Sequence, residues 1–115
     1  MRIPDQPPPT AGMGESIQAL VREDLAITRI AGGTEVIADL DEREHVGISR
    51  YGDSLRAYNG RDPLIDAYQE NLDLAVYLRQ AIEEDSGLDE HLHEMYQTAL
   101  SLCCRMRQRL TQTDR

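Results

Sequence analysis

The chain has 115 residues and a formal net charge of −9 at pH 7, and 29% of its residues are charged. This length is typical of one domain, and the acidic balance argues against a nucleic-acid polymer as partner, because phosphates favour a basic surface. The only cysteines, Cys103 and Cys104, are adjacent, which excludes a disulfide framework; with no apolar run long enough for a membrane, we expect a soluble cytoplasmic protein.

The first half of the chain predicts a leader and two helices. Residues 1–14 are expected to form a flexible, proline-rich leader, because positions 7–9 are all proline. Apolar residues recur at helical spacing over residues 15–30 and predict a first helix that ends before a pair of glycines. Thr34 can then cap a second helix that runs to about Arg50.

The second half begins with a predicted loop over residues 52–61. It is followed by Asp62-Pro63, an acid at the N-cap position and a proline at the first helical position. This pair is typical of a helix start, and the apolar pattern carries the third helix to about Glu84. Residues 85–87 interrupt it.

A fourth helix is predicted over residues 88–110, and residues 113–115 form a short tail. We find no convincing strand. Four helices with short connections predict an all-α fold, a four-helix bundle in a single domain over residues 15–112. Their strong apolar faces predict a homodimer or higher homo-oligomer that completes the fold.

The third helix carries three carboxylates on one side. Asp66, Glu70 and Asp73 fall within roughly 60° of one another at about 100° per residue. Apolar residues flank this acidic stripe on both sides, and the wet face is expected around Asn71 and Arg79. The stripe is therefore predicted to point into the bundle or into a cleft.

The second helix shows a similar pattern, because Glu44 lies in the middle of its apolar face and Asp41 at the edge. Buried carboxylates must be protonated, paired or bound to metal. The i, i+3 pairs Asp41/Glu44 and Glu70/Asp73 can each present two oxygens to one site, and oxygen ligands suit Mg²⁺ or Mn²⁺. Alternatively, the acids form salt bridges in a purely structural protein, with Arg43, Arg50, Arg61 or Arg79 as partners.

The stretch Val36 to Glu84 resembles the MazG-like branch of the all-α nucleoside triphosphate pyrophosphohydrolases, including small phage and actinobacterial proteins. The resemblance rests on acid-x2-acid on one helix and Glu-x2-Asp on the next. It implies an obligate oligomer in a bacterial cytoplasm that uses Mg²⁺ to cleave a (d)NTP into a nucleoside monophosphate and pyrophosphate. The catalytic metal ligands that it implies are Glu44, Glu70 and Asp73, with Asp41 as a fourth. The acidic stripe adds Asp66 as a further candidate ligand.

The chain also departs from the family pattern. It has Asp41 where the motif has Glu, and Gln69-Glu70 where the motif has two Glu. The shorter side chain and the missing carboxylate leave a second function open, a non-catalytic nucleotide-binding or helical interaction protein on the same fold.

Candidate substrate-binding residues lie at the helix ends and in the loop between them. Arg50 and Arg61 can contact phosphates, or can pair with the acids instead. Tyr51 and Tyr77 can stack on a base, or can belong to the core. Asn59 can read the nucleotide or shape the loop.

Overall fold

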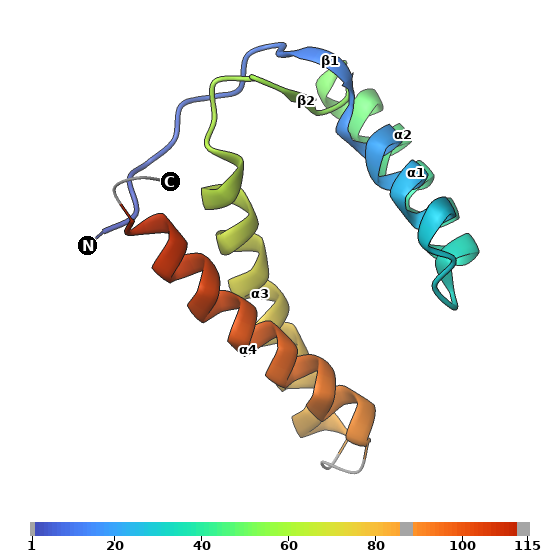
Figure 1. Cartoon of the computed structure of the whole chain (residues 1–115), viewed down its shortest axis with the longest axis vertical. Helices are drawn as coiled ribbons and strands as arrows, with labels where there is room; N and C mark the ends of the chain where they lie inside the picture. Colours follow the sequence, from blue (N-terminus) through green and yellow to red (C-terminus); the bar gives the residue numbers. More distant parts are fainter. Residues whose placement is uncertain (1, 86–88, 113–115) are drawn as a thin grey trace. The chain divides into compact units, whose positions relative to one another are not determined.

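The computed structural model describes residues 2–85 and 89–112, so the predicted tail at residues 113–115 lies outside the described part. The chain is mostly helical, which confirms the predicted helical class. Its elements in chain order are β1 (Met13–Ser16), α1 (Ile17–Thr28), α2 (Gly33–Tyr51), β2 (Arg56–Ala57), α3 (Pro63–Glu84) and α4 (Glu90–Leu110) (Figure 1). They form two compact units, here called the N-terminal unit (Gln6–Arg61) and the C-terminal unit (Met1–Asp5 with Asp62–Arg115).

In the N-terminal unit, α1 and α2 pack as a helical hairpin (Figure 1). The α1 helix starts at Ser16, whose hydroxyl accepts a hydrogen bond from the backbone N–H of Ala19 at 3.0 Å, as a helix N-cap does. The N-cap of α2 is Gly32, at φ 84°, in the left-handed region that glycine adopts freely. The prediction of Thr34 as the cap is therefore wrong, since Thr34 lies in the first turn of α2.

The N-terminal unit also contains two short strands, one before α1 and one after α2, although the sequence predicts none. The β1 strand pairs antiparallel with β2, Met13 opposite Ala57, and the register is irregular. Gly12 precedes β1 at φ 75°, and a Cβ there would lie only 2.5 Å from the carbonyl oxygen of Ala57, so the close approach requires glycine. The backbone N–H of Thr10 donates to the carbonyl oxygen of Asn59 at 2.6 Å. The strands are too short to show the alternation that identifies strands in sequence.

In the C-terminal unit, the predicted bounds of α3 are confirmed. Asp62 is the N-cap, its carboxylate accepting from a backbone N–H of the first turn, Pro63 occupies the first helical position, and the helix ends at Glu84. Asp89 caps α4 in the same way. The predicted start at Leu88 and most of the predicted break belong to residues 86–88, which lie outside the described part.

The α3 and α4 helices pack against each other, and an amide lies buried between them. Asn71 is 6% exposed, and its Nδ2 donates to the carbonyl oxygen of Ala99 at 2.9 Å and to Sγ of Cys103 at 3.0 Å. These bonds offset the cost of burying a polar group. The prediction that Asn71 faces water is therefore wrong. The buried apolar residues of the two helices are Ile65, Ala75, Ile82, Ala99 and Leu110.

Within residues 2–85 and 89–112, no helix has both the length and the apolar character needed to cross a membrane. The four-helix bundle and the homo-oligomer need contacts between the two units or between copies of the chain. Both stay predictions.

Replacing Asn71 with Asp is expected to destabilise the protein by roughly 2–4 kcal/mol at neutral pH, because a carboxylate would face the carbonyl oxygen of Ala99 without a partner. Urea unfolding measures the difference. Gln69→Glu is the matched control, since it makes the same amide-to-acid change at an exposed position of α3 and should alter stability by no more than about 0.5 kcal/mol. Equal effects of the two substitutions would contradict the buried role of Asn71.

Candidate functional site

The carboxylate of Glu44 accepts hydrogen bonds from three side chains of the N-terminal unit. Its Oε2 accepts hydrogen bonds from the hydroxyls of Ser16, at 2.6 Å, and Ser54, at 2.8 Å. Its Oε1 accepts from Nη2 of Arg22 at 3.3 Å. The Glu44 side chain is 14% exposed. One side chain therefore links the start of α1, the middle of α1, α2 and the loop that follows α2.

These contacts keep Glu44 ionised. The hydrogen bonds from Ser16 and Ser54 lower the pKa of Glu44 most, and the nearby charge and hydrogen bond of Arg22 lower it further. Loss of water around the carboxylate opposes this shift without reversing it. At neutral pH Glu44 is therefore ionised, and its charge is paired with that of Arg22.

Arg22 also holds the second predicted acid of α2. Its Nε and Nη2 both approach Oδ1 of Asp41, at 2.7 Å and 2.6 Å. Asp41 and Glu44 are thus both salt-bridged, as the alternative interpretation of the sequence expects. The arginine is not among the predicted partners, however, because it lies on α1 and reaches Asp41 and Glu44 only through the packing of the hairpin.

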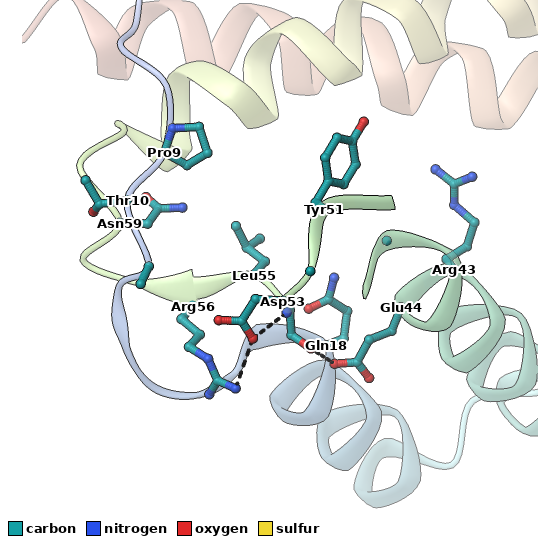
Figure 2. A pocket seen from close by; sticks show the side chains of 14 residues that line it. Pro9, Thr10, Gln18, Arg43, Glu44, Tyr51, Asp53, Leu55, Arg56 and Asn59 are labelled. Atoms are coloured by element: carbon teal, nitrogen blue, oxygen red, sulfur yellow. Dashed lines mark hydrogen bonds and ion pairs between the residues drawn. The ribbon is translucent and has the colours of Figure 1, made fainter. Parts of the chain in front are cut away.

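An open pocket of about 640 Å³ lies in the N-terminal unit beside Glu44 (Figure 2). It brings Glu44 together with two predicted substrate-binding residues, Tyr51 and Asn59. The polar residues that the sequence analysis did not single out for this site are Thr10, Gln18, Arg43, Asp53, Ser54 and Arg56. The guanidinium of Arg43 and the ring of Tyr51 can contact a planar, anionic ligand, whereas the carboxylates of Glu44 and Asp53 favour a cation.

The two tyrosines proposed for base stacking are both exposed. Tyr51 is 77% exposed and Tyr77 66% exposed, so the alternative that they belong to the core is wrong. The guanidinium carbon of Arg50 lies 5.9 Å from the centroid of the Tyr51 ring, within the range of a cation–π interaction. Tyr77 belongs to the C-terminal unit and Tyr51 to the pocket of the N-terminal unit.

Asn59 and Arg61 both have structural roles in the loop. Oδ1 of Asn59 accepts a hydrogen bond from the backbone N–H of Arg61 at 3.2 Å, which confirms the turn-shaping interpretation of Asn59. Nη1 of Arg61 donates to the carbonyl oxygen of Pro7 at 2.7 Å. This guanidinium therefore fastens the proline-rich segment to the loop.

The acids of α3 belong to the C-terminal unit. Glu70 and Asp73 are exposed, and Asp66 is half-buried. Because Asn71 faces α4, the acidic stripe lies outside the α3–α4 contact. The described residues contain no group of three acidic, histidine or cysteine side chains close enough to hold a metal ion. A site shared between Glu44 and Glu70 would join the two units and stays a prediction.

A scan against protein-family models, a search of curated proteins and a search of solved structures each found no match.

Sequence reasoning missed the residues that surround Glu44. Ser16 carries a usable signal, because a serine directly before an apolar helical pattern is a favoured N-cap. Arg22 and Ser54 carry none, since only the packing of α1, α2 and the loop brings them to the carboxylate.

Replacing Glu44 with Gln is expected to lower stability at pH 7. The pKa of Glu44 is below its ordinary value of 4.5, so its ionised form stabilises the fold above that pH, and this contribution is lost as the pH falls through the folded-state pKa. Urea unfolding of both proteins at pH 7 and at about pH 3 tests this, and the difference should shrink in acid. Glu42→Gln, at an exposed position of α2, is the control and should show no such pH dependence. A constant difference for Glu44→Gln would contradict the prediction.

Proposed function

We propose that the chain is a Mg²⁺-dependent nucleoside triphosphate pyrophosphohydrolase, active with Mn²⁺ as well, that acts in a bacterial cytoplasm. It converts a (d)NTP to the monophosphate and pyrophosphate. The observation that carries this proposal is the pocket of the N-terminal unit, which gathers the ionised Glu44, the exposed ring of Tyr51 and the amide of Asn59. The sequence resemblance supports it independently.

The side chains of the proposed site are of the chemical type that binds a hard divalent cation. Asp41, Glu44, Glu70 and Asp73 would hold it, since all four supply carboxylate oxygens. When bound, such an ion neutralises phosphate charge and activates water. The hydroxyls of Ser16 and Ser54 keep Glu44 ionised and oriented for this purpose.

The phosphate chain carries negative charge, and guanidinium groups of the pocket can attract it. Arg43 and Arg56 line the pocket, and Arg50 lies over the Tyr51 ring. Charge-assisted hydrogen bonds from arginine to phosphate are short and directional. Tyr51 offers an exposed ring on which a base can stack.

Association of several copies of the chain would support the proposed hydrolase activity. On α3, the exposed acids Glu70 and Asp73 lie among exposed apolar residues, including Leu72 and Val76. An exposed apolar surface of this kind is typical of an interface. We therefore propose a homodimer or a higher homo-oligomer in which the acids of α3 contribute to the catalytic site.

The purified protein is expected to release pyrophosphate from at least one (d)NTP in the presence of Mg²⁺. Glu70→Gln should lower the rate by roughly 100-fold or more, because loss of even an indirect metal partner costs about 10–100-fold. A coupled pyrophosphate assay over a panel of (d)NTPs measures this. Glu83→Gln is the matched control on α3, because Glu83 is exposed and pairs with Arg79. No release by the wild type, or equal rates for the two variants, would contradict the proposal.

A second candidate is a nucleotide-binding protein without turnover. It is favoured by Arg22, which bridges Asp41 and Glu44 and so supplies positive charge where the enzyme would need a metal. This function predicts a rise in melting temperature with nucleotide and no pyrophosphate. Nucleotide-dependent stabilisation and pyrophosphate release measured on one sample separate the two functions.

A further inference from the structure

Arg22 contacts both of the predicted metal ligands of α2 through a single nitrogen atom. Its Nη2 lies 2.6 Å from Oδ1 of Asp41 and 3.3 Å from Oε1 of Glu44, and its Nε donates to the same Oδ1 at 2.7 Å. The two acids are neighbours on the helix surface, where like charges repel each other. The guanidinium therefore acts as a cation that the two carboxylates share.

The two oxygens of Glu44 have partners of different kinds. Oε2 accepts hydrogen bonds from the neutral hydroxyls of Ser16 at 2.6 Å and Ser54 at 2.8 Å. Oε1 accepts from the charged Nη2 of Arg22. A metal ion that binds Glu44 without breaking the serine contacts has to use Oε1, so the metal ion and the guanidinium compete for one oxygen atom.

Arg22 can withdraw from this position while Glu44 stays in place. The Arg22 side chain is 39% exposed, against 14% for Glu44, so a withdrawn guanidinium regains water at little cost. Glu44 keeps its two serine donors, which come from the N-cap of α1 and from the loop after α2. The serines therefore keep the carboxylate oriented when the arginine leaves.

The N-terminal unit gains little stability from apolar burial, so a cation between the two acids matters for its fold. Both helices of the hairpin are described in full; α1 has no buried residue, and α2 buries only Gly33. Arg22 lies on α1 and joins it to α2 through both carboxylates. We therefore expect the metal-free hairpin to depend on these salt bridges.

We propose that Arg22 is a positioning residue that holds Asp41 and Glu44 together in the metal-free chain and is displaced when a divalent cation binds. Because the guanidinium has to leave first, Arg22 also lowers the affinity of the site for the metal. Taking the site to be a metal site rests on the proposed function. The salt bridges of Arg22 are thus compatible with a metal at the same place, since the arginine serves as the cation until the metal binds.

Arg22→Gln tests the proposal on the full chain without nucleotide, so that no turnover interferes. The variant should bind Mn²⁺ about tenfold more tightly than the wild type, because two partly exposed ion pairs no longer compete with the metal. Its melting temperature without metal should be about 4 °C lower. Isothermal titration calorimetry gives the affinities and differential scanning calorimetry the melting temperatures. A purely structural arginine predicts instead that stability and Mn²⁺ affinity fall together.

Saturating Mn²⁺ provides a second readout on the same proteins. The metal-bound form lacks the Arg22 contacts in the wild type as well as in Arg22→Gln, so the two melting temperatures should come together. A difference in melting temperature that is as large with Mn²⁺ as without it would overturn the proposal. So would an Arg22→Gln protein whose Mn²⁺ affinity is unchanged or weaker.

Arg43→Gln is the matched control, because it removes the same charge beside Glu44 and leaves the salt bridges of Arg22 intact. Arg43 adjoins Glu44 in sequence and is exposed. Screening by salt should limit its effect on Mn²⁺ affinity to about twofold. Equal gains in affinity for Arg43→Gln and Arg22→Gln would show a general effect of charge and would overturn the displacement of Arg22.

Arg22→Lys keeps the positive charge and replaces Arg22→Gln in the test if that variant does not fold. A single ammonium group cannot match the paired N–H donors of a guanidinium, so it competes less well with the metal. Mn²⁺ should bind this variant about threefold more tightly than the wild type. The wild-type affinity for Mn²⁺ in Arg22→Lys would contradict the proposal.

The measurements also distinguish this proposal from the hydrolase function. If the wild type releases no pyrophosphate from any (d)NTP but Arg22→Gln binds Mn²⁺ about tenfold more tightly, the displacement of Arg22 stands and the hydrolase fails. If pyrophosphate is released but Arg22→Gln binds Mn²⁺ no more tightly than the wild type, the hydrolase stands and the displacement fails. Absence of Mn²⁺ binding to both proteins would overturn the displacement whatever the pyrophosphate assay shows.

Discussion

The N-terminal unit depends on one half-buried carboxylate and its three donors. Glu44 lies on α2, but the groups that satisfy it come from the N-cap of α1, from Arg22 in the middle of α1 and from Ser54 in the following loop. Each donor is distant from Glu44 in sequence or belongs to a different element. The ionised carboxylate therefore holds the hairpin and the loop in one arrangement, and the pocket forms beside it.

The same contacts suit a chemical role for this carboxylate. Oε2 is occupied by two hydroxyl donors at short distance, whereas Oε1 has a single, longer contact with Arg22. A carboxylate that stays ionised and is fixed in orientation is well prepared to meet a cation or a positively charged ligand. A structural role and a catalytic role for Glu44 thus depend on the same hydrogen bonds. Arg22 distinguishes the two roles, because it supplies positive charge at the place where a catalytic role would need a metal ion.

The C-terminal unit shows why an acidic stripe can be misplaced by sequence reasoning. Apolar side chains flank the stripe on both sides, yet Leu72 and Val76 are exposed, while the buried positions of α3 include Asn71 and Ala75. The contact between α3 and α4 thus includes a polar group beside the buried apolar residues, with the Asn71 amide bonded to the backbone of α4. Leu72, Val76 and the acids Glu70 and Asp73 are exposed together on α3.

Local signals in the sequence determined the helical class, the start and approximate end of α3 and the approximate limits of α1 and α2. Asp62 and Pro63 define the start of α3 because a cap acts on the residues directly after it. The i, i+3 spacing of Asp41 with Glu44 likewise placed both acids close together on α2. Hydrophobic periodicity could not tell which side of α3 meets α4, because a hydrogen-bonded asparagine can lie in a helix contact and an apolar residue can lie outside it.

Only the tertiary structure decided the partners of Glu44, the pairing of β1 with β2 and the pocket beside Glu44. These features join residues that are remote in the chain, and their energies exist only once the hairpin has packed. Sequence periodicity describes the faces of one helix, whereas a hydrogen bond such as that from Arg22 to Glu44 depends on where a second helix lies.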